Sequence, residues 1–307
     1  MKAMILAAGL GTRLAPLSEE KPKALMPIGN RPIISRTLDL LYQYGVRQIV
    51  INAHHHSRQL IDYLKTKKPN GLEIDIRVEP KILGHGGGIR NTLDFWDDEP
   101  FIVINSDILT NINLDRAYAF HRASGGLATM VLHEFERDSQ ILVDEEMKIT
   151  DIAPNRIGGR LAFTGIHIIE PDLLTYIPEG EFSSIIDCYC DMIKSGRRIN
   201  GYLSSGHYWW DINTAANYLT ANKEILALEN TPFCLPQDTE LDISVKLLDW
   251  AVIGSNCKIG EEVTISSSVV WEGSTLENGS FVKDSVVTPK RIVKVGEMKA
   301  QGAKPKE

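Results

Sequence analysis

Apolar positions in the first two thirds of the chain switch repeatedly between strand-like and helix-like spacing. Continuous or alternating apolar runs predict strands at residues 3–8, 46–52, 72–78, 101–105 and 127–132. Apolar residues three and four apart predict helices at residues 33–42, 60–64, 88–95, 114–124, 185–193 and 214–228. Strands that alternate with helices form crossover units. We therefore predict an α/β fold, a Rossmann-like and mostly parallel sheet with helices on both faces.

Ligands of such sheets bind beyond the carboxyl ends of the strands. Three polar or glycine-rich segments of this sequence directly follow predicted strands, near Gly9, Glu79 and Asp107. We expect the chemistry of the protein at these points.

The pattern changes after residue 232 to a period of six. Ile253, Ile259 and Ile265 form one series, and a second series runs from Cys257 through 263, 269 and 275 to Phe281. A hexapeptide repeat is typical of a β-helix, in which each coil buries small and aliphatic residues. We predict a catalytic domain at residues 1–232, then a short left-handed β-helix and a polar, frayed tail at 233–307.

Composition narrows the possible partners. Of 307 residues, 33 are basic and 40 are acidic, a formal net charge of −7, which argues against nucleic acid or an anionic membrane as a general partner. The four cysteines are too few for a disulfide framework, so we expect reduced thiols and a cytoplasmic protein. The apolar start could imitate a signal peptide, but we interpret it as a buried strand that leads into a glycine turn.

That glycine turn is the most specific motif. Gly9 and Gly11 let the backbone approach a ligand closely and turn amide N–H groups toward oxyanions. Arg13 and Lys23 can then neutralise phosphate oxygens. The motif is neither a Walker A loop nor a dinucleotide fingerprint, because Leu14 stands at the third glycine position.

The sequence resembles the sugar-1-phosphate nucleotidyltransferases, also called nucleotide-sugar pyrophosphorylases, over residues 1 to about 230. The resemblance rests on five motifs: Gly9–Arg13 with Pro22-Lys23, Glu79-Pro80 with 83–88, 105–107, 163–166 and 210–214. The C-terminal coils resemble those of mannose-1-phosphate guanylyltransferases. The catalytic region resembles N-acetylmuramate-1-phosphate uridylyltransferases about as well.

The resemblance implies a reaction in which an NTP and a sugar 1-phosphate give an NDP-sugar and pyrophosphate. Such chemistry asks the protein to align two anions and to stabilise spreading charge. It also implies Mg²⁺ as cofactor, with Asp107 and Asp211 as ligands. Arg13 and Lys23 are the implied catalytic residues, and Lys23 also contacts the sugar phosphate.

The remaining implied contacts fall into two groups. The nucleotide-binding positions are Leu6, Ala7, Gly9, Gly11, Thr12, Arg13, Glu79 and Gly84. The positions that face the sugar phosphate are Lys23, Thr164, Gly165 and Ser183. Trp209 and Trp210, next to Asp211, are as well suited to the core as to stacking on a base or sugar.

Three positions depart from the family pattern: His85 stands where Thr is frequent, and Ser106 and Asn213 stand where Gly is usual. Asn tolerates positive φ best after Gly, so we expect a turn to survive at Asn213. Since both carboxylates and both cations are kept, we expect activity. The alternative is a catalytically weak homologue that binds an NDP-sugar and regulates a partner through its coils.

The sequence leaves the base of the NTP and the identity of the sugar undetermined, because two of its features favour different substrates. Many guanylyltransferases carry Gly-Gly where this chain has Ala8-Gly9, so the resemblance favours a pyrimidine at this point, such as UTP with an amino sugar. The coils favour GTP with a mannose-type sugar. The coils contain no histidine to serve as the base of a second acyl-transfer site, so a structural, oligomerising or regulatory role suits them better. The histidines at 54–56 are adjacent and point in different directions, so we interpret them as a strand end rather than a metal site.

Overall fold

The computed structural model describes residues 1–135, 139–155, 157–237 and 239–295. The polar tail predicted to fray therefore lies outside the described residues. The helices are α1 Ile33–Gln43, α2 Ser57–Lys67, α3 Gly84–Arg90, α4 Leu114–Ser124, α5 Ile185–Lys194 and α6 Ala215–Leu228. Within the described ranges, no helix is both long enough and apolar enough to cross a bilayer.

The chain packs into two compact units. Unit 1 comprises Met1–Leu10 and Ile34–Trp209, and unit 2 comprises Gly11–Ile33 and Trp210–Glu307. The glycine motif is thus split, with Gly9 in unit 1 and Gly11 in unit 2. The domain boundary at residue 232 stays a prediction.

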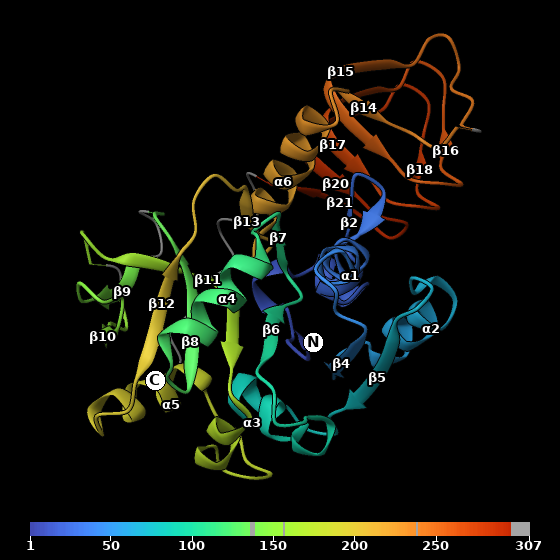
Figure 1. Ribbon diagram of the computed structural model, residues 1–307. Coiled ribbons are helices and arrows are strands. Elements are labelled where there is room, and N and C mark those ends of the chain that lie inside the picture. Colours follow the sequence, from blue (N-terminus) through green and yellow to red (C-terminus); the bar gives the residue numbers. More distant parts are fainter. Residues whose placement is uncertain (136–138, 156, 238, 296–307) are drawn as a thin grey trace, which may run out of the picture. The chain divides into compact units, whose positions relative to one another are not determined.

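Unit 1 is built on a nine-stranded sheet with the order β10-β9-β11-β6-β1-β4-β5, and β8 pairs with both β11 and β12 (Figure 1). The strands of unit 1, with β7 outside this sheet, are β1 Lys2–Ala7, β4 Gln48–Ala53, β5 Glu73–Val78, β6 Phe101–Asn105, β7 Ile108–Thr110, β8 Ala128–His133, β9 Ser139–Val143, β10 Ile149–Ile152, β11 Leu161–Ile169 and β12 Ile199–Leu203. β13, Trp209–Asp211, ends unit 1 and begins the second part of unit 2. The predicted mixed α/β fold is confirmed.

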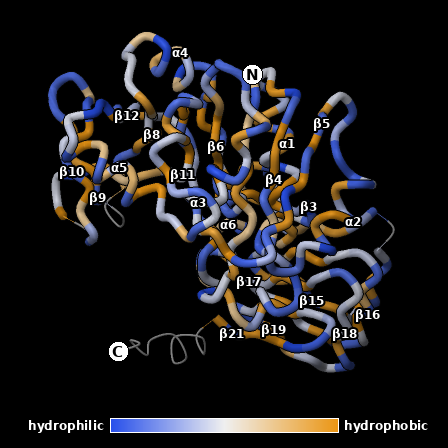
Figure 2. Tube along the Cα trace, turned by 90° about the horizontal axis from the view of Figure 1, so that it is seen from below, coloured by the Kyte–Doolittle hydropathy of each residue, from blue (hydrophilic) through white to orange (hydrophobic). Residues whose placement is uncertain are grey.

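The direction of the strands follows from their connections. β6, β1, β4 and β5 are parallel, as crossover helices require. β11 is antiparallel to β6, β8 and β9, since β9, β10 and β11 follow one another without a helix. Figure 2 shows hydrophobic residues along the central strands, where β4 and β6 are buried almost throughout.

Helices cover both faces of this sheet. On β8, Met130 belongs to the core cluster that contains Tyr189 of α5. The next side chain toward the N-terminus, Thr129, points the opposite way and bonds His121 of α4 (2.9 Å). Adjacent strand residues thus meet helices on opposite faces, as the sequence predicts.

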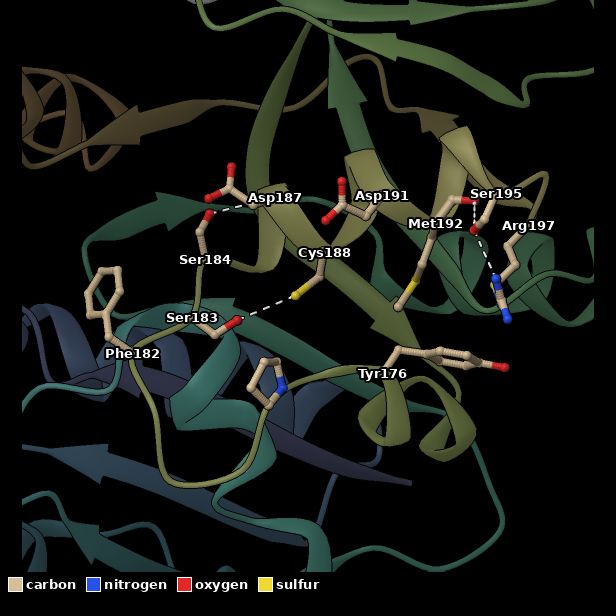
Figure 3. Close-up of a pocket in the computed structure, with 11 residues that line it drawn as sticks. Tyr176, Phe182, Ser183, Ser184, Asp187, Cys188, Asp191, Met192, Ser195 and Arg197 are labelled. Carbon is tan, nitrogen blue, oxygen red and sulfur yellow. Dashed lines mark hydrogen bonds between the residues drawn. The ribbon is translucent and has the colours of Figure 1, made fainter.

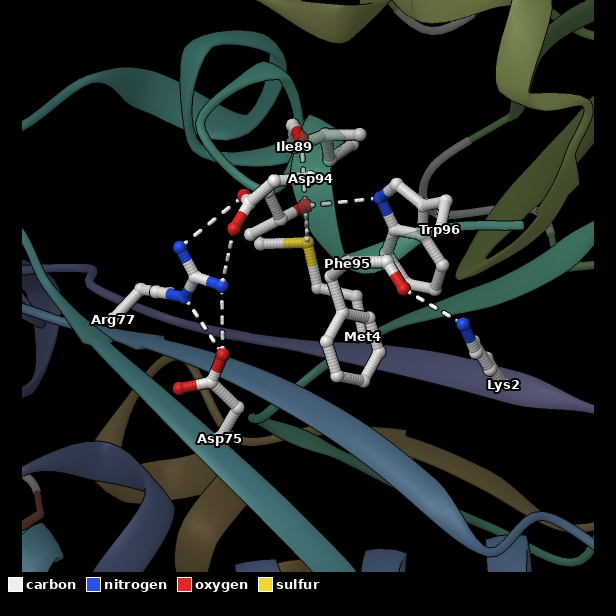
Figure 4. Close-up of polar contacts among 9 residues, drawn as sticks. Lys2, Met4, Asp75, Arg77, Ile89, Asp94, Phe95 and Trp96 are labelled. Carbon is white, nitrogen blue, oxygen red and sulfur yellow. Dashed lines mark hydrogen bonds and ion pairs between the residues drawn. The ribbon is translucent and has the colours of Figure 1, made fainter.

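Polar contacts fix the segment that follows α3 to the sheet (Figure 4). The guanidinium of Arg77 on β5 pairs with Asp75 (2.8 Å) and Asp94 (2.9 Å). Lys2 of β1 donates to the carbonyl of Phe95 (2.8 Å). The 310 helix Leu93–Phe95, which follows α3, is therefore held to β5 through Asp94 and to β1 through Phe95.

Unit 2 contains α6, a two-stranded hairpin and stacked parallel strands. The strands are β2 Pro27–Ile28, β3 Arg31–Pro32, β14 Phe233–Cys234, β15 Lys246–Ile253, β16 Lys258–Ile259, β17 Thr264–Val270, β18 Thr275–Leu276, β19 Phe281–Lys283, β20 Ser285–Val287 and β21 Ile292–Lys294. Val252 pairs with Val269, and Val269 with Val286, so a strand stacks on the one about 17 residues earlier.

That spacing corrects one part of the six-residue pattern. Three hexapeptides would place paired residues of successive coils 18 positions apart. Because β17 and β19 pair at a spacing of 17, the repeat of six no longer predicts which residue of β19 is buried. Leu276 and Val282 are buried, whereas Thr275 and Phe281 of the second series are exposed, Phe281 by 67%. Ile253, Val263, Ile265 and Val269 are buried as the pattern predicts.

Candidate functional site

The predicted nucleotide positions of unit 1 meet where parallel strands end. Asn52, at the end of β4, accepts a hydrogen bond from the amide of Ala7 (2.8 Å) and donates one to Oε1 of Glu79 (2.7 Å). Oε2 of Glu79 accepts from the amide of Leu83 (3.1 Å). We call Ala7, Asn52, Glu79 and Leu83 the strand-end cluster. Asn52 and Glu79 are each 2% exposed, so the cluster sets the backbone around Ala7 and Gly84.

Sequence reasoning missed Asn52. The available signal was a polar residue at the end of an otherwise apolar strand, where a buried amide needs partners. His54 also lies here, and its Nδ1 is 2.7 Å from the carbonyl oxygen of Glu79. This contact ties the first histidine of 54–56 to the strand end.

The glycines after Glu79 allow close packing. They form α3, which begins at Gly84 with φ +71°, earlier than the predicted 88–95. A Cβ on Gly86 would lie 2.8 Å from Oγ of Ser183, and one on Gly88 would lie 2.6 Å from Nδ2 of Asn52. Larger residues would therefore push α3 away from the strand-end cluster and from Ser183.

Ser183 joins α3 to a cavity of about 410 Å³ (Figure 3). Its carbonyl accepts from the amide of Gly86 (2.8 Å), and its amide donates to Leu83 (2.8 Å). Its Oγ faces Cys188 of α5 (Sγ at 3.4 Å). The cavity is lined by Tyr176, Pro178, Phe182, Ser183, Ser184, Asp187, Cys188, Asp191, Met192, Ser195 and Arg197. The predicted contact of Ser183 with the sugar stays a prediction.

The segment around Thr164 is a bulge in β11. Thr164 is fully buried, and its hydroxyl donates to the carbonyl of Val131 (2.8 Å) while its own carbonyl accepts from Nε1 of Trp209 (2.8 Å). Gly165 has φ +79°, and a Cβ there would lie 2.9 Å from Nδ2 of Asn105. Trp209 therefore positions this bulge, which has room only for glycine at 165.

Asp107 lies immediately beyond β6, as the sequence predicts. The amide of Ser106 donates to the carbonyl of Leu6 (3.1 Å), which places Asp107 beside the end of β1. Ser106 is 6% exposed, so the side chain at the departure position is buried. Asp107 itself is half-buried.

In unit 2, residues Gly11–Ile33 form what we call the signature loop. Gly11 has φ +67°, and a Cβ there would lie 3.3 Å from Cγ of Lys23. Thr12 and Arg13 follow in a 310 helix (Thr12–Leu14) and are exposed. Lys23 begins another 310 helix (Lys23–Leu25), and its Nζ donates to Oδ1 of Asn213 (2.6 Å).

Asp211 is held by two asparagine amides of unit 2. Asn213 donates to Oδ2 (2.6 Å), and Asn217 donates to Oδ1 (2.6 Å) and to the carbonyl of Asp211 (3.0 Å). Asn213 therefore bridges Asp211 and Lys23. Sequence reasoning predicted a turn at Asn213 and did not identify Asn217. Asn213 is not among the residues with positive φ in the described chain, and its amide serves as a bridge instead.

These donors suit a magnesium ligand. Each oxygen of Asp211 receives one neutral N–H, which orients the carboxylate and leaves it acceptor capacity for a hard cation. Among the residues that the structure describes, no three His, Cys, Asp or Glu side chains form a metal-binding group. The resemblance predicts two ligands only, the carboxylates of Asp107 and Asp211.

Comparison with known proteins identifies the family. Residues 2–227 match the family described as nucleotidyl transferase. The chain belongs to this family. Its relatives include a UTP–glucose-1-phosphate uridylyltransferase of Synechocystis, 27% identical over 94% of this chain and 87% of that protein. A mannose-1-phosphate guanyltransferase of Schizosaccharomyces pombe is 30% identical over 84% of this chain and 74% of that protein.

A solved structure supports the fold. HddC from Yersinia pseudotuberculosis, in complex with GMP-PN, covers 73% of this chain and 99% of its own, with 24% identity and a TM-score of 0.63. The family match and the two relatives above confirm the resemblance to the sugar-1-phosphate nucleotidyltransferases and the prediction of an enzyme.

Proposed function

We propose that this nucleotidyltransferase moves a nucleotidyl group from an NTP to a sugar 1-phosphate in the presence of Mg²⁺, and releases an NDP-sugar and pyrophosphate. One observation of unit 2 carries the proposal. Asn213 joins the ammonium of Lys23 to the carboxylate of Asp211, so a phosphate-binding cation and a metal-type ligand are held at a fixed distance. Phosphoryl chemistry needs this pairing, since positioning and charge stabilisation supply most of the catalysis.

The residues divide the work as follows. The sugar phosphate oxygen attacks the α-phosphorus in line, and Lys23 neutralises phosphate charge near that centre. Arg13, on the exposed 310 helix after Gly11, binds the triphosphate and the departing pyrophosphate. Asp107 and Asp211 would hold Mg²⁺, which supplies further neutralisation of the phosphates when bound.

Substrate contacts are proposed from the same resemblance. The backbone from Leu6 to Gly9 and at Gly84 binds the base and ribose. The strand-end cluster supports this role because Asn52 and Glu79 fix the backbone there. Thr164, Gly165 and Ser183 face the sugar.

The base and the sugar have two candidate combinations. The relatives include a uridylyltransferase named for glucose 1-phosphate and guanylyltransferases named for mannose 1-phosphate. A mannose-type sugar with GTP and an amino sugar with UTP are the two that the sequence favours. The weak, regulatory homologue is not favoured, since the enzyme family is matched over residues 2–227.

The test is a panel of four NTPs against several sugar 1-phosphates, read by pyrophosphate release with and without Mg²⁺. We expect turnover that needs both substrates and the metal ion. Asp107→Asn should abolish it, while Asp115→Asn, at an exposed position early in α4, should leave it unchanged. Binding without turnover across the whole panel would contradict the proposal.

The C-terminal strands are proposed to form the left-handed β-helix that the sequence predicts. Their parallel stacking at about 17 residues supports a coil, and such a coil suits an oligomer contact of a cytoplasmic enzyme. Sedimentation of the full chain at several protein concentrations tests the oligomer contact. A full chain that sediments as a monomer at every concentration would contradict it.

A further inference from the structure

We propose that the C-terminal strands of unit 2 position the signature loop for catalysis, with Arg291, Thr288 and Trp271 as positioning residues for Lys23. The proposal rests on the proposed function for its kinetic readout. The supporting contacts lie within unit 2, and those that reach the signature loop join residues more than 190 positions apart in the sequence.

The first connection is acidic. Glu20 has a side chain only 8% exposed, and its Oε1 accepts from the hydroxyl of Thr288 (2.9 Å) and pairs with Nε of Arg291 (3.1 Å). Arg291 also pairs with Glu19 (3.2 Å). A carboxylate this buried needs a fixed cationic partner, so the chain between β20 and β21 holds this end of the loop.

Thr288 and Arg291 are themselves well ordered by their turn. The amide of Thr288 donates to the carbonyl of Arg291 (2.8 Å), and the hydroxyl of Thr288 accepts from the amide of Arg291 (3.1 Å). The two side chains that grip Glu20 therefore come from one closed turn. These two hydrogen bonds set the positions of both residues relative to each other.

The second connection is aromatic. The ammonium of Lys21 lies 5.2 Å from the ring centroid of Trp271, and burial lowers the pKa of Lys21. Nε1 of Trp271 donates to the hydroxyl of Tyr218 (3.0 Å), and that hydroxyl donates to the carbonyl of Pro27 (2.6 Å). One indole of the C-terminal strands thus contacts the loop before Lys23 directly, and it contacts the loop after Lys23 through Tyr218.

The third connection fixes the hairpin at the end of the loop. Nδ2 of Asn30 donates to the carbonyl of Ile253 on β15 (2.7 Å), and the amide of Gly29 donates to Oδ1 of Asn222 (3.0 Å). The loop is therefore held on both sides of Lys23. A misplacement of about 1 Å at a reacting group costs on the order of 100-fold in rate, so these contacts bear on catalysis.

The C-terminal strands therefore contribute to the catalytic region as well as following it in the sequence. They complete the pre-organisation of the loop that carries Lys23. A change in the C-terminal strands should reach the reaction through residues 19–30.

The experiment compares Arg291→Ala with Lys283→Ala in the full chain. Lys283 is an exposed lysine of β19 and serves as the matched control. We expect Arg291→Ala to lower kcat/KM for the NTP about 10-fold or more. We also expect faster hydrogen exchange in the peptide that covers residues 17–30, with no change in exchange of β4 and β6. Lys283→Ala should change neither, and Arg291→Lys should restore part of the loss.

A second variant keeps the test decisive if Arg291→Ala does not fold. Glu20→Gln preserves the shape of the side chain and removes its charge. The double variant that combines Glu20→Gln with Arg291→Lys should have a kcat/KM only slightly below that of the less active single variant, because both substitutions act on one contact.

The outcomes separate the two proposals. Unchanged exchange at residues 17–30 in Arg291→Ala and Glu20→Gln would overturn the inference, whatever the activity. Faster exchange with kcat/KM within about twofold of the parent protein would overturn it too, because the loop would then be held without effect on catalysis. A parent chain inactive across the substrate panel would contradict the proposed function, while the exchange measurement would still decide whether the strands hold the loop.

Discussion

Removal of the Asn52 amide should destabilise unit 1 far more than its size suggests. Asn52→Ala leaves the amide of Ala7 and Oε1 of Glu79 buried without their partner. A buried polar group without a hydrogen bond costs about 1–3 kcal/mol, and more when it is charged. Two such groups give an expected loss of about 2–6 kcal/mol in the free energy of unfolding. That is a large fraction of the about 5–15 kcal/mol that stabilises a typical protein.

The assay is urea unfolding at neutral pH, followed by circular dichroism, with Gln48→Ala as control. Gln48 lies at the other end of β4, where its side chain contacts exposed Glu73 (2.8 Å), so its removal should cost at most about 0.5 kcal/mol. In a double-mutant cycle with Glu79→Ala, Asn52→Ala should show a coupling of about 0.5–3 kcal/mol. Equal losses in Asn52→Ala and Gln48→Ala, or strict additivity in the cycle, would refute the reasoning.

Three further predictions concern packing, pH and the phosphate cation. Gly86→Ala should lower the free energy of unfolding by about 1–3 kcal/mol, because its Cβ would lie 3.1 Å from the backbone nitrogen of Ile185. Gly158→Ala is the control, since a Cβ there would meet no atom within 4 Å. Equal melting temperatures for the two variants would contradict the packing argument. Burial lowers the pKa of His167 to about 3, so below about pH 6.5 the unfolded state takes up a proton first, and stability falls by about 1.4 kcal/mol per pH unit toward pH 3. Urea titrations of His167→Phe at several pH values should show a free energy of unfolding that depends less steeply on pH, by the contribution of one histidine. An unchanged pH dependence would exclude His167 as its source. Arg13→Ala should lower kcat on the order of 100-fold with an unchanged fold, since Arg13 is exposed, and unchanged turnover would remove Arg13 from the mechanism.

Local patterns predicted β1, β4, β5, β6 and β8 and helices at or overlapping α1 to α5, but not β7, β9, β10, β11 or β12. The helix at Leu114–Ser124 has the predicted bounds, and the strand ends at Ala7, Val78 and Asn105 place the expected polar segments at one edge of the sheet. Apolar periodicity is a local signal, and in these segments each element buries the face that its own residues define.

Long-range contacts were not predictable in the same way. Asn52 and Asn217 stand out only when the partners that they bind are known, since a single polar residue in a strand or helix has many possible uses. The packing of the signature loop with the C-terminal strands depends on Glu20 and Arg291, 271 residues apart, and no periodicity links them. The sequence analysis did not predict β11, and alternation would in any case predict a strand and not the strand with which it pairs.

The stoichiometry of the reaction is the most direct test of the central claim. Phosphorus NMR of the full chain with Mg²⁺, one NTP and one sugar 1-phosphate, taken from the active pair of the panel, follows each phosphate separately. The account predicts one NDP-sugar for each pyrophosphate released, and no reaction when the sugar 1-phosphate is left out. Release of pyrophosphate with NMP, or of inorganic phosphate with NDP, would instead show hydrolysis of the NTP and contradict nucleotidyl transfer to a sugar.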